Sequence, residues 1–454
     1  MKYLDATNTI HEIEDKYDVM SIKYKGVSVW PYLRIYICDS LNESPKAKGY
    51  SSSAISLIFK DLFHYNVFSF FRKCLIWDYS SSYTRKQVGE LYEHHVSGFL
   101  ANSGLSYLMI ETPISGFKRL KKKDIPEEII VSESWARLLS GLIEMVLRIF
   151  PLKIEGEDVL KAIYKDYNIS LNYHLRLRWL YAQKKTTDFF LAIGRRPKLF
   201  TLECYYSQMG RIWSAHNHYI PVVELQHGVL NASHYAYNSK FHSKELYPDE
   251  ILVYGEQEYN YFTNVQKQFV DRVSKVGLYI LERSSTYFSD DIFKDIRKEY
   301  NKLIVVAGQT GFEEQLSSFI DSVAKELTEC YFIYIPRLPN TISFSSQNVK
   351  YIYGVNIYEY LKWCDVHVTI SSTTCLEAHY FERPVVFCDF NGVAQLYYGS
   401  FLKEENGAYY LNNKVDFINT IRNIPEHVQI PVELFSKNNA MLTKQVLKRY
   451  LNKN

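Results

Sequence analysis

The chain has 454 residues, more than one ordinary hydrophobic core accommodates, so two domains of about 200 residues are expected. Its apolar fraction of 47% and charged fraction of 23% are those of a globular protein and exclude a disordered chain. The formal net charge is only +3, from 53 Lys and Arg against 50 Asp and Glu, which excludes a dedicated nucleic-acid-binding protein.

The cysteines and the apolar runs limit the compartment and the membrane topology. The seven cysteines are odd in number and scattered, so we expect reduced thiols of a cytoplasmic protein and neither a disulfide framework nor a zinc site. Residues 1–18 are charged and lack the apolar stretch of a signal peptide. No run of about 20 uninterrupted apolar residues occurs, so no transmembrane helix is predicted.

Residues 1–72 carry mixed signals that predict no defined element. Within them, residues 51–71 contain five phenylalanines beside Lys60, Arg72 and Lys73. Such a segment could bind a membrane surface, although a buried amphipathic helix is the more frequent structure. Peripheral attachment to the cytoplasmic face of the inner membrane is therefore one expectation, beside a purely cytoplasmic location.

From residue 73 onward, short apolar runs alternate with stretches of helical periodicity, which is the pattern of βα units in a parallel sheet. Strands are predicted within residues 73–86, 105–113 and 249–262. A strand, a helix and a second strand are predicted within 198–228. We expect these segments to form a Rossmann-like lobe that, with a mixed N-terminal extension, occupies residues 1–285.

A polar stretch over residues 281–302 predicts no strong strand and is interpreted as a hinge. The alternation then restarts as strand, helix, strand, short strand, helix, strand, helix, strand. These elements predict a second Rossmann-like lobe over residues 286–435 and a final helix over 436–454 that packs on either lobe. The predicted fold class is α/β, with two parallel sheets facing each other across a cleft.

A run of hydroxyl side chains follows the predicted strand VHVTI, at Ser371, Ser372, Thr373 and Thr374. Hydroxyls and free amides at a helix start can bind phosphate, because the first N–H groups of a helix have no partner within it. Glu377 lies one turn further on the same face, where a carboxylate can accept hydrogen bonds from the diol of a ribose. Phosphate and ribose together indicate a nucleotide. The structural alternative is an N-capping Ser372 or Thr373 with a solvated Glu377.

Residues 371–387 resemble the donor-binding segment of GT-B glycosyltransferases, in which a serine and threonine pair precedes Glu-Ala, a turn and a strand. Residues 225–228, LQHG, followed by YG at 254–255, are similar to the corresponding lobe of bacterial surface-polysaccharide and teichoic-acid-type transferases. The resemblance implies a GT-B-like fold, with a nucleotide-sugar donor on the second lobe and an acceptor on the first. The implied activity is sugar transfer to a growing bacterial surface glycan, such as capsule or lipopolysaccharide O-antigen, often lipid-linked in such pathways.

Two further segments of the second lobe are candidates for the donor phosphates. In the resembling family a loop after a strand commonly faces them, and here VVAGQTG places Gly308, Gln309, Thr310 and Gly311 there. Backbone amides of such a turn can approach an anion, although two glycines are also common for structural reasons alone. Arg337 takes the place where the family usually has a histidine, and its guanidinium is a competent phosphate ligand. This departure leaves the nucleotide undefined.

A histidine beside a glycine at the end of an apparent buried strand is the main candidate for catalysis. Transfer requires a base for the proton of the acceptor hydroxyl, and imidazole suits this role at neutral pH. We therefore expect His227 to be the base and Gly228 to leave room for the acceptor, with Glu203 as the rival base. Gln226 and His234 are expected in the same cleft. The alternative is a core histidine, or one that only binds the donor.

The loop after the first strand offers Tyr83, Arg85 and Lys86 to the cleft, although a solvated loop also fits it. A basic run at residues 121–123 is usually a solvated face and could also touch anionic lipid. A metal-dependent transferase needs an Asp-x-Asp pair after a strand, and the nearest acidic cluster, SDDIFKD, follows none. No metal or other cofactor is expected, so the leaving-group charge is assigned to the helix start and Arg337.

Three other functions fit the same architecture. A nucleotide-sugar 2-epimerase would need no acceptor, but the acidic cluster expected for it is not evident in the sequence. A polyol-phosphate transferase shares the histidine-glycine resemblance. A non-catalytic nucleotide-binding scaffold of a polysaccharide assembly complex would carry a degenerate site. The sequence leaves the sugar, the nucleotide, the linkage, the oligomeric state and the stereochemical course open.

Overall fold

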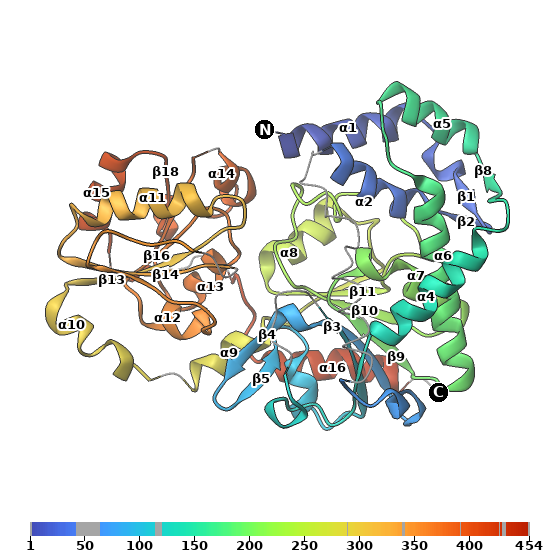
Figure 1. The fold of residues 1–454 in the computed structure, drawn as a ribbon, viewed down its shortest axis with the longest axis horizontal. Coiled ribbons are helices and arrows are strands. Elements are labelled where there is room, and N and C mark those ends of the chain that lie inside the picture. Colours follow the sequence, from blue (N-terminus) through green and yellow to red (C-terminus); the bar gives the residue numbers. More distant parts are fainter. Residues whose placement is uncertain are drawn as a thin grey trace.

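The computed structural model describes residues 2–41, 64–113, 120–287, 289–337, 341–390, 392–425, 427–428 and 433–452. The chain forms two α/β lobes, each built around one parallel sheet, with the first lobe at the right of Figure 1 and the second at the left. The predicted fold class of two Rossmann-like lobes is therefore confirmed. Most of the phenylalanine-rich segment, up to residue 63, lies outside the described residues.

The sheet of the first lobe has seven strands, and every neighbouring pair is parallel. Its central strands are buried on both faces, which explains why they appear in the sequence as short continuous apolar runs. In spatial order the strands are β12 (Arg272–Lys275), β11 (Glu250–Val253), β10 (Val222–Leu225), β9 (Leu199–Leu202), β3 (Ile76–Ser81), β6 (Tyr107–Thr112) and β7 (Ile130–Ser132).

The sheet of the second lobe has six strands, again all parallel. The sequence pattern predicted every strand of this sheet except β18, an edge strand in which three of the four residues are only half-buried. In spatial order the strands are β15 (Val349–Tyr351), β14 (Cys330–Ile335), β13 (Lys302–Ala307), β16 (Val366–Thr369), β17 (Val385–Cys388) and β18 (Ala408–Leu411).

The direction in which strands are added reverses once in each sheet. In the first lobe the chain builds β3, β6 and β7 towards one edge and β9 to β12 towards the other, so the reversal lies between β3 and β9. In the second lobe the reversal lies between β13 and β16. Ligands of open parallel sheets bind outside the carboxyl ends of the strands that flank such a reversal. The topology therefore places the expected binding regions in the loops after these four strands.

The N-terminal residues, which the sequence did not place, belong to the first lobe. Helices α1 (Lys2–Lys16) and α2 (Trp30–Leu41) pack together, and their buried side chains share one core with the first sheet. Arg34 lies inside this core, where its Nε donates to Glu14 Oε1 and its Nη2 donates to Asn238 Oδ1, each at 2.7 Å. The extension is thus fastened to the loop that follows β10.

The C-terminal helix α16 (Asn439–Leu451) packs on the first lobe (Figure 1). Arg449 Nη2 donates to Glu250 Oε1, and the Tyr450 hydroxyl donates to Glu250 Oε2, each at 2.6 Å. Because Glu250 begins β11, these bonds attach the end of the chain to the first sheet. The sequence left either lobe open for this helix, and the structure selects the first.

The remaining helices and short strands complete the layers around the two sheets and the link between them. Within the described ranges, no helix is both long and apolar enough to span a lipid bilayer. Residues 2–287 also contain β1 (Lys23–Tyr24), β2 (Val27–Ser28), β4 (Arg85–Val88), β5 (Leu91–His94), β8 (Ile154–Glu155), α4 (Ser134–Leu147), α5 (Glu157–Asp166), α6 (Tyr173–Ile193), α7 (Tyr205–Asn217), α8 (Glu256–Asn260) and α9 (Tyr279–Ser285). Residues 289–425 also contain α10 (Ile296–Glu299), α11 (Glu313–Ala324), α12 (Ile357–Trp363), α13 (Thr374–Tyr380), α14 (Val393–Tyr398) and α15 (Lys414–Asn423).

Candidate functional site

Loops from the carboxyl ends of the two sheets meet at the boundary between the lobes, which we call the interlobe site. His95, directly after β5 of the first lobe, places its Nε2 4.0 Å from Glu377 Oε1 of the second lobe. The guanidinium of Arg337, after β14, lies over the ring of Tyr83, with 5.2 Å between its carbon and the ring centroid. Residues that the sequence assigned separately to the donor and the acceptor lobes are therefore neighbours.

Glu377 is the most deeply buried charged group on the second-lobe side of this site. Glu377 is only 4% exposed, and its Oε1 accepts a hydrogen bond from the Tyr358 hydroxyl at 3.3 Å. Burial raises the pKa of Glu377 to about 7, although Lys86 and the Tyr358 hydroxyl oppose the shift. The solvated glutamate considered from the sequence is therefore wrong. A buried carboxylate with one hydrogen bond keeps lone pairs for a ligand hydroxyl.

The four hydroxyl residues before Glu377 are half-buried, but their side chains are not equivalent. Thr374 Oγ1 forms a 2.9 Å hydrogen bond with Nε2 of the buried His367, so this hydroxyl is already used inside the second lobe. Ser372 Oγ accepts from the Thr374 N–H at 3.4 Å. The hydroxyls of Ser371 and Thr373 form no hydrogen bond with the described residues, which leaves these two free for a ligand.

The loop after β13 approaches the reversal point of the second sheet. A Cβ on Gly308 would lie 2.6 Å from Glu313 Oε2 and 2.9 Å from the Cα of Pro336, so packing alone requires glycine there. Gln309 Oε1 is buried and has no hydrogen-bond partner among the described residues. Leaving a buried amide oxygen unpaired is costly, so this atom marks a point where a ligand or water is expected to bind. Thr310 is exposed beside it.

Two cations lie at the interlobe site, Lys86 from the first lobe and Arg337 from the second. Burial lowers the pKa of Lys86, and Arg337 acts in the same direction while Glu377 opposes both. A cation that is disfavoured by burial and by a neighbouring cation gains stability when an anion binds. Lys86 and Arg337 together can therefore stabilise an anion at this site.

His95 is a candidate that the sequence did not suggest. Burial lowers its pKa to about 3, and Lys86 and His227 act in the same direction, so the ring is neutral at pH 7. Its Nε2 is buried and finds no hydrogen-bond partner in the described chain, because the 4.0 Å to Glu377 is too long. The only local signal is the pair of histidines at the end of the β4–β5 hairpin, of which His94 points into the lobe and His95 to its boundary.

The two rival bases follow neighbouring strands of the first sheet, Glu203 after β9 and His227 after β10. Glu203 Oε2 accepts from the Ser81 N–H at 2.7 Å and from the Thr84 hydroxyl at 3.3 Å, which joins the ends of β3 and β9 at the reversal point. Burial raises the pKa of Glu203 to about 7. Burial lowers the pKa of His227 to about 4, while hydrogen bonding to the backbone of Glu203 opposes it. Both groups can accept a proton at pH 7, and the pKa of Glu203 suits a base better.

Gln226 orders the loop that carries His227. Its Nε2 donates to the Gly228 carbonyl at 2.8 Å and to Glu258 Oε1 at 3.0 Å, and its Oε1 accepts from the Tyr254 N–H at 2.6 Å. With its amide fully engaged, Gln226 holds the loop that carries His227 in place. A Cβ on Gly228 would meet no atom within 4 Å, so the space beside this glycine is open.

A cluster of carboxyl groups, not evident in the sequence, lies around Tyr254. The pKa of the Tyr254 hydroxyl is raised by burial and further by the charges of Glu377, Glu258 and Glu203, so all three carboxyl groups lie near this hydroxyl. Burial raises the pKa of Glu258 to about 7, as it does for the other two. In the described ranges, no group of three or more His, Cys, Asp or Glu side chains is arranged to hold a metal ion. Three carboxyl groups that change protonation near neutral pH are equipped for acid–base chemistry.

His234 lies in an aromatic group beside the site. Its ring centroid is 4.9 Å from that of Tyr237 and 6.1 Å from that of Tyr206. Burial lowers the pKa of His234 to about 3, and His227 acts in the same direction. The ring is therefore neutral at pH 7 and contributes packing beside His227.

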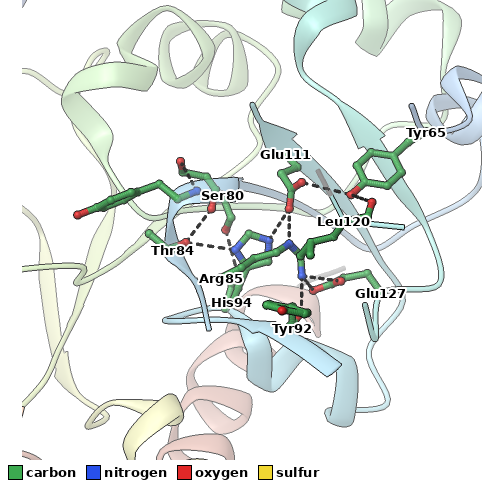
Figure 2. Close-up of polar contacts among 12 residues, drawn as sticks. Tyr65, Ser80, Thr84, Arg85, Tyr92, His94, Glu111, Leu120 and Glu127 are labelled. Atoms are coloured by element: carbon green, nitrogen blue, oxygen red, sulfur yellow. Dashed lines mark hydrogen bonds and ion pairs between the residues drawn. The ribbon is translucent and has the colours of Figure 1, made fainter. Parts of the chain in front are cut away.

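Arg85 does not face the interlobe site, which corrects the prediction from the sequence. Its Nε lies 2.5 Å from Glu111 Oε2 and its Nη1 lies 3.0 Å from Glu127 Oε2, all inside the first lobe. Figure 2 shows this buried network, in which Glu111 also forms a 3.1 Å hydrogen bond with His94. Burial would raise the pKa of Glu111, but Arg85 and His94 hold it at about 2. Arg85 instead supports the hairpin that carries Lys86 to the site.

Replacing Arg85 with methionine is expected to lower the free energy of unfolding by about 3–5 kcal/mol, because two buried carboxylates lose their cation. The folded-state pKa of Glu111 is depressed, so its stabilisation is present above the ordinary carboxyl pKa and is lost as the pH falls towards 2. The loss should therefore be larger at about pH 7 than at about pH 4 in urea unfolding. Lys161→Met, which removes an exposed cation paired with Glu157, is the control and should cost less than about 1 kcal/mol. A pH-independent cost for Arg85→Met would contradict this account of the network.

Comparison with known proteins identifies the fold. No protein-family model matches the chain, and no curated protein matches its sequence. The structure is similar to that of MnaA from S. aureus in a co-structure with UDP, with a TM-score of 0.53 and 11% identity over 84% of this chain and 97% of that chain. It is also similar to a UDP-glucosyltransferase from Polygonum tinctorium, with a TM-score of 0.50 and 9% identity over 84% of this chain and 99% of that chain. A UDP-GlcNAc 2-epimerase from Neisseria meningitidis bound to UDP-GlcNAc gives a TM-score of 0.47 and 10% identity over 84% of this chain and 100% of that chain. The fold is GT-B-like, and the activity has to be argued from the interlobe site.

Proposed function

We propose that the protein is a glycosyltransferase that moves a sugar from a nucleotide-sugar donor to a growing bacterial surface glycan, such as capsule or O-antigen, without a metal ion. The observation that carries the proposal is the meeting of Glu377 with Lys86 and His95 across the lobe boundary. A carboxylate that can accept from a diol and a cation that can bind phosphate are what a nucleotide sugar requires. The strand reversals support this position, because both lie beside it.

The donor is assigned mainly to the second lobe. Glu377 accepts hydrogen bonds from the ribose diol, and the free hydroxyls of Ser371 and Thr373 lie before it for the phosphates. Lys86 and Arg337 supply positive charge from opposite lobes, so a bound diphosphate would hold the lobes together. The unpaired Gln309 Oε1 accepts from a donor hydroxyl or from a bound water.

The transfer step uses the first lobe. The acceptor oxygen forms a bond with the anomeric carbon, and the bond from that carbon to the phosphate oxygen breaks, with the electron pair leaving on the nucleotide. The acceptor proton goes to Glu203 or His227, and Gly228 leaves space beside them for the acceptor. Lys86 and Arg337 meet the negative charge that develops on the leaving phosphate, which is the role that a metal ion has in other transferases.

The carboxyl cluster favours one second candidate, a nucleotide-sugar 2-epimerase. Glu203 and Glu258 have pKa values raised to about 7 by burial, so each can accept or donate a proton at neutral pH. Such an enzyme would act on the donor alone and would need no acceptor. The two candidates share the donor site, so nucleotide binding supports both and the products separate them.

The first experiment is a thermal-shift panel with UDP, GDP, CDP, CMP, ADP and dTDP, without metal and then with Mg²⁺. We expect one nucleotide to raise the melting temperature without metal, since a ligand at one hundred times its Kd stabilises a fold by about 2.7 kcal/mol. The corresponding nucleotide sugar is then incubated in D2O with no acceptor. A transferase leaves carbon 2 of the sugar unlabelled, whereas a 2-epimerase incorporates deuterium there. Absence of any nucleotide-induced shift would contradict both candidates.

A further inference from the structure

Helices α4 and α6 form an antiparallel pair on the side of the first lobe away from the second lobe (Figure 1). Ser140 and Thr186 share a 2.8 Å hydrogen bond, and Arg178 Nη2 donates to the Phe150 carbonyl at 3.4 Å, which fixes the antiparallel register. Interior positions of α4, such as Ser140, are buried. The opposite face of α4 is therefore the outer surface of the molecule.

This outer surface of α4 is apolar where an exposed helix face is normally polar. Large side chains project at the spacing of one helix face and continue into the residues after the helix. Single exposed apolar residues are common, but a contiguous set of this size marks an interaction surface. The exposed fractions are 52% for Leu142, 62% for Met145, 56% for Val146, 77% for Ile149 and 59% for Phe150.

A second exposed apolar group lies at the other end of the pair. Phe189 and Ile193 on α6 are 47% and 44% exposed, and Phe68 and Phe71 are 70% and 49% exposed. The two segments are in contact, since the rings of Phe70 and Phe190 stack with 4.2 Å between centroids. We call both groups together the α4–α6 patch.

Basic residues outnumber acidic ones along the two helices of the α4–α6 patch, although the whole chain is nearly neutral. Residues 134–150 and 173–196 contain only two acids, and both are engaged, Glu144 with Arg148 and Asp188 with Lys184. The exposed cations Arg72, Lys73, Arg195 and Arg196 have no ion pair with the described residues. Four of the eight basic residues in these ranges are ion-paired with Glu133, Glu144 or Asp188. The eight are Arg137, Arg148, Arg176, Arg178, Lys184, Lys185, Arg195 and Arg196.

We propose that the α4–α6 patch docks the protein on an anionic lipid bilayer. At the α6 end of the patch, Arg72, Arg195 and their neighbours place cations beside apolar side chains, and this combination matches the acyl boundary and the negative headgroups of such a surface. The apolar face of α4 extends the contact towards the other end of the helix pair. A second copy of this chain fits less well, because a symmetric dimer through the patch brings the same cations face to face. Docking through the outer side of the first lobe leaves the interlobe site open, and it does not depend on which nucleotide sugar is used.

The test is sedimentation of the full chain with phosphatidylcholine vesicles that contain about 30% phosphatidylglycerol, compared with vesicles of phosphatidylcholine alone. We expect binding to the anionic vesicles only, with a loss of most binding in about 0.5 M NaCl. Ile149→Ser with Phe150→Ser should weaken binding at least about tenfold. Arg195→Gln with Arg196→Gln should weaken it by about 10- to 30-fold, from the attraction of each cation to the headgroups.

Matched controls use exposed residues outside the patch. Val415→Ser on the second lobe, 67% exposed, and Lys267→Gln with Lys350→Gln should bind vesicles as the parent chain does. Unchanged melting temperatures verify that the patch variants fold. Equal binding to neutral and anionic vesicles, or no binding at all, overturns the proposal. A concentration-dependent dimer in sedimentation velocity that Ile149→Ser abolishes also overturns it, because the patch would then bind a second copy.

Discussion

Replacing Glu377 with glutamine is expected to weaken nucleotide binding by about 10- to 100-fold, because a hydrogen bond to a charged acceptor contributes about 1.5–3 kcal/mol. The substitution keeps the shape of the side chain and the contact with Tyr358, so the fold should be retained. Burial raises the pKa of Glu377 to about 7, and the acceptor form is the carboxylate. Nucleotide affinity of the parent chain should therefore increase as the pH rises through 7, whereas the variant should keep only the pH dependence that comes from ionisation of the nucleotide's own terminal phosphate, at about pH 6.

Calorimetric titration with the nucleotide selected by the thermal-shift panel, at about pH 6 and pH 8, measures both effects. Glu314→Gln is the matched control, because Glu314 is an exposed carboxylate on α11 of the same lobe. Tyr358→Phe removes the hydrogen bond to Glu377 and should change affinity less than the loss of the carboxylate does. An unchanged Kd in Glu377→Gln would remove Glu377 from the nucleotide site and leave Lys86 and Arg337 to bind an anion of another kind.

The parts of the fold that the sequence predicts correctly are the strands whose residues are buried on both faces of a sheet. Strands such as β10 and β16 are buried on both faces and therefore appear as short continuous apolar runs between polar turns. The hairpin of β4 and β5 was not predicted, because three of its four buried residues, Arg85, Glu93 and His94, are polar or charged and give no apolar run. The N-terminal helices were missed for a related reason, since their buried face includes polar groups such as Arg34, whose partners lie far along the chain.

The arrangement of the second-lobe residues of the candidate site was predictable because they are consecutive. The strand, the hydroxyl run and Glu377 lie within one strand–turn–helix unit, so their spacing alone places them together. The other half depends on distant segments. His95 and Lys86 reach Glu377 only through the packing of the hairpin, and Arg85 turns inward because Glu111 and Glu127 are buried beside it. The spacing of Arg85 and Lys86 in the hairpin does not indicate which of the two cations forms an ion pair inside the first lobe.

Glu203→Gln is expected to lower kcat at saturating donor by about 10²- to 10⁴-fold and to remove the pH dependence of kcat near 7. Burial raises the pKa of Glu203 to about 7, and a base must be ionised to act. At saturating donor, the parent kcat should therefore rise as the pH increases through 7 and reach a plateau above it. The variant retains the hydrogen bonds from Ser81 and Thr84 to a side-chain oxygen, so its melting temperature should change little.

His227→Ala distinguishes the two bases, because burial lowers the pKa of His227 to about 4. If His227 accepts the proton, the parent kcat at saturating donor is flat between about pH 6 and pH 8, and His227→Ala causes the larger loss. If Glu203 accepts it, His227→Ala keeps the rise through pH 7 at a lower level, since the neutral imidazole then serves as a hydrogen-bonding group. Glu377 also ionises near pH 7 and affects donor affinity, so the rates are compared at saturating donor, where affinity no longer affects them. Glu203 is assigned as the base if the rise of kcat through pH 7 disappears in Glu203→Gln. The geometry favours Glu203, because it lies at the strand reversal and its pKa matches the pH at which the proton must be taken.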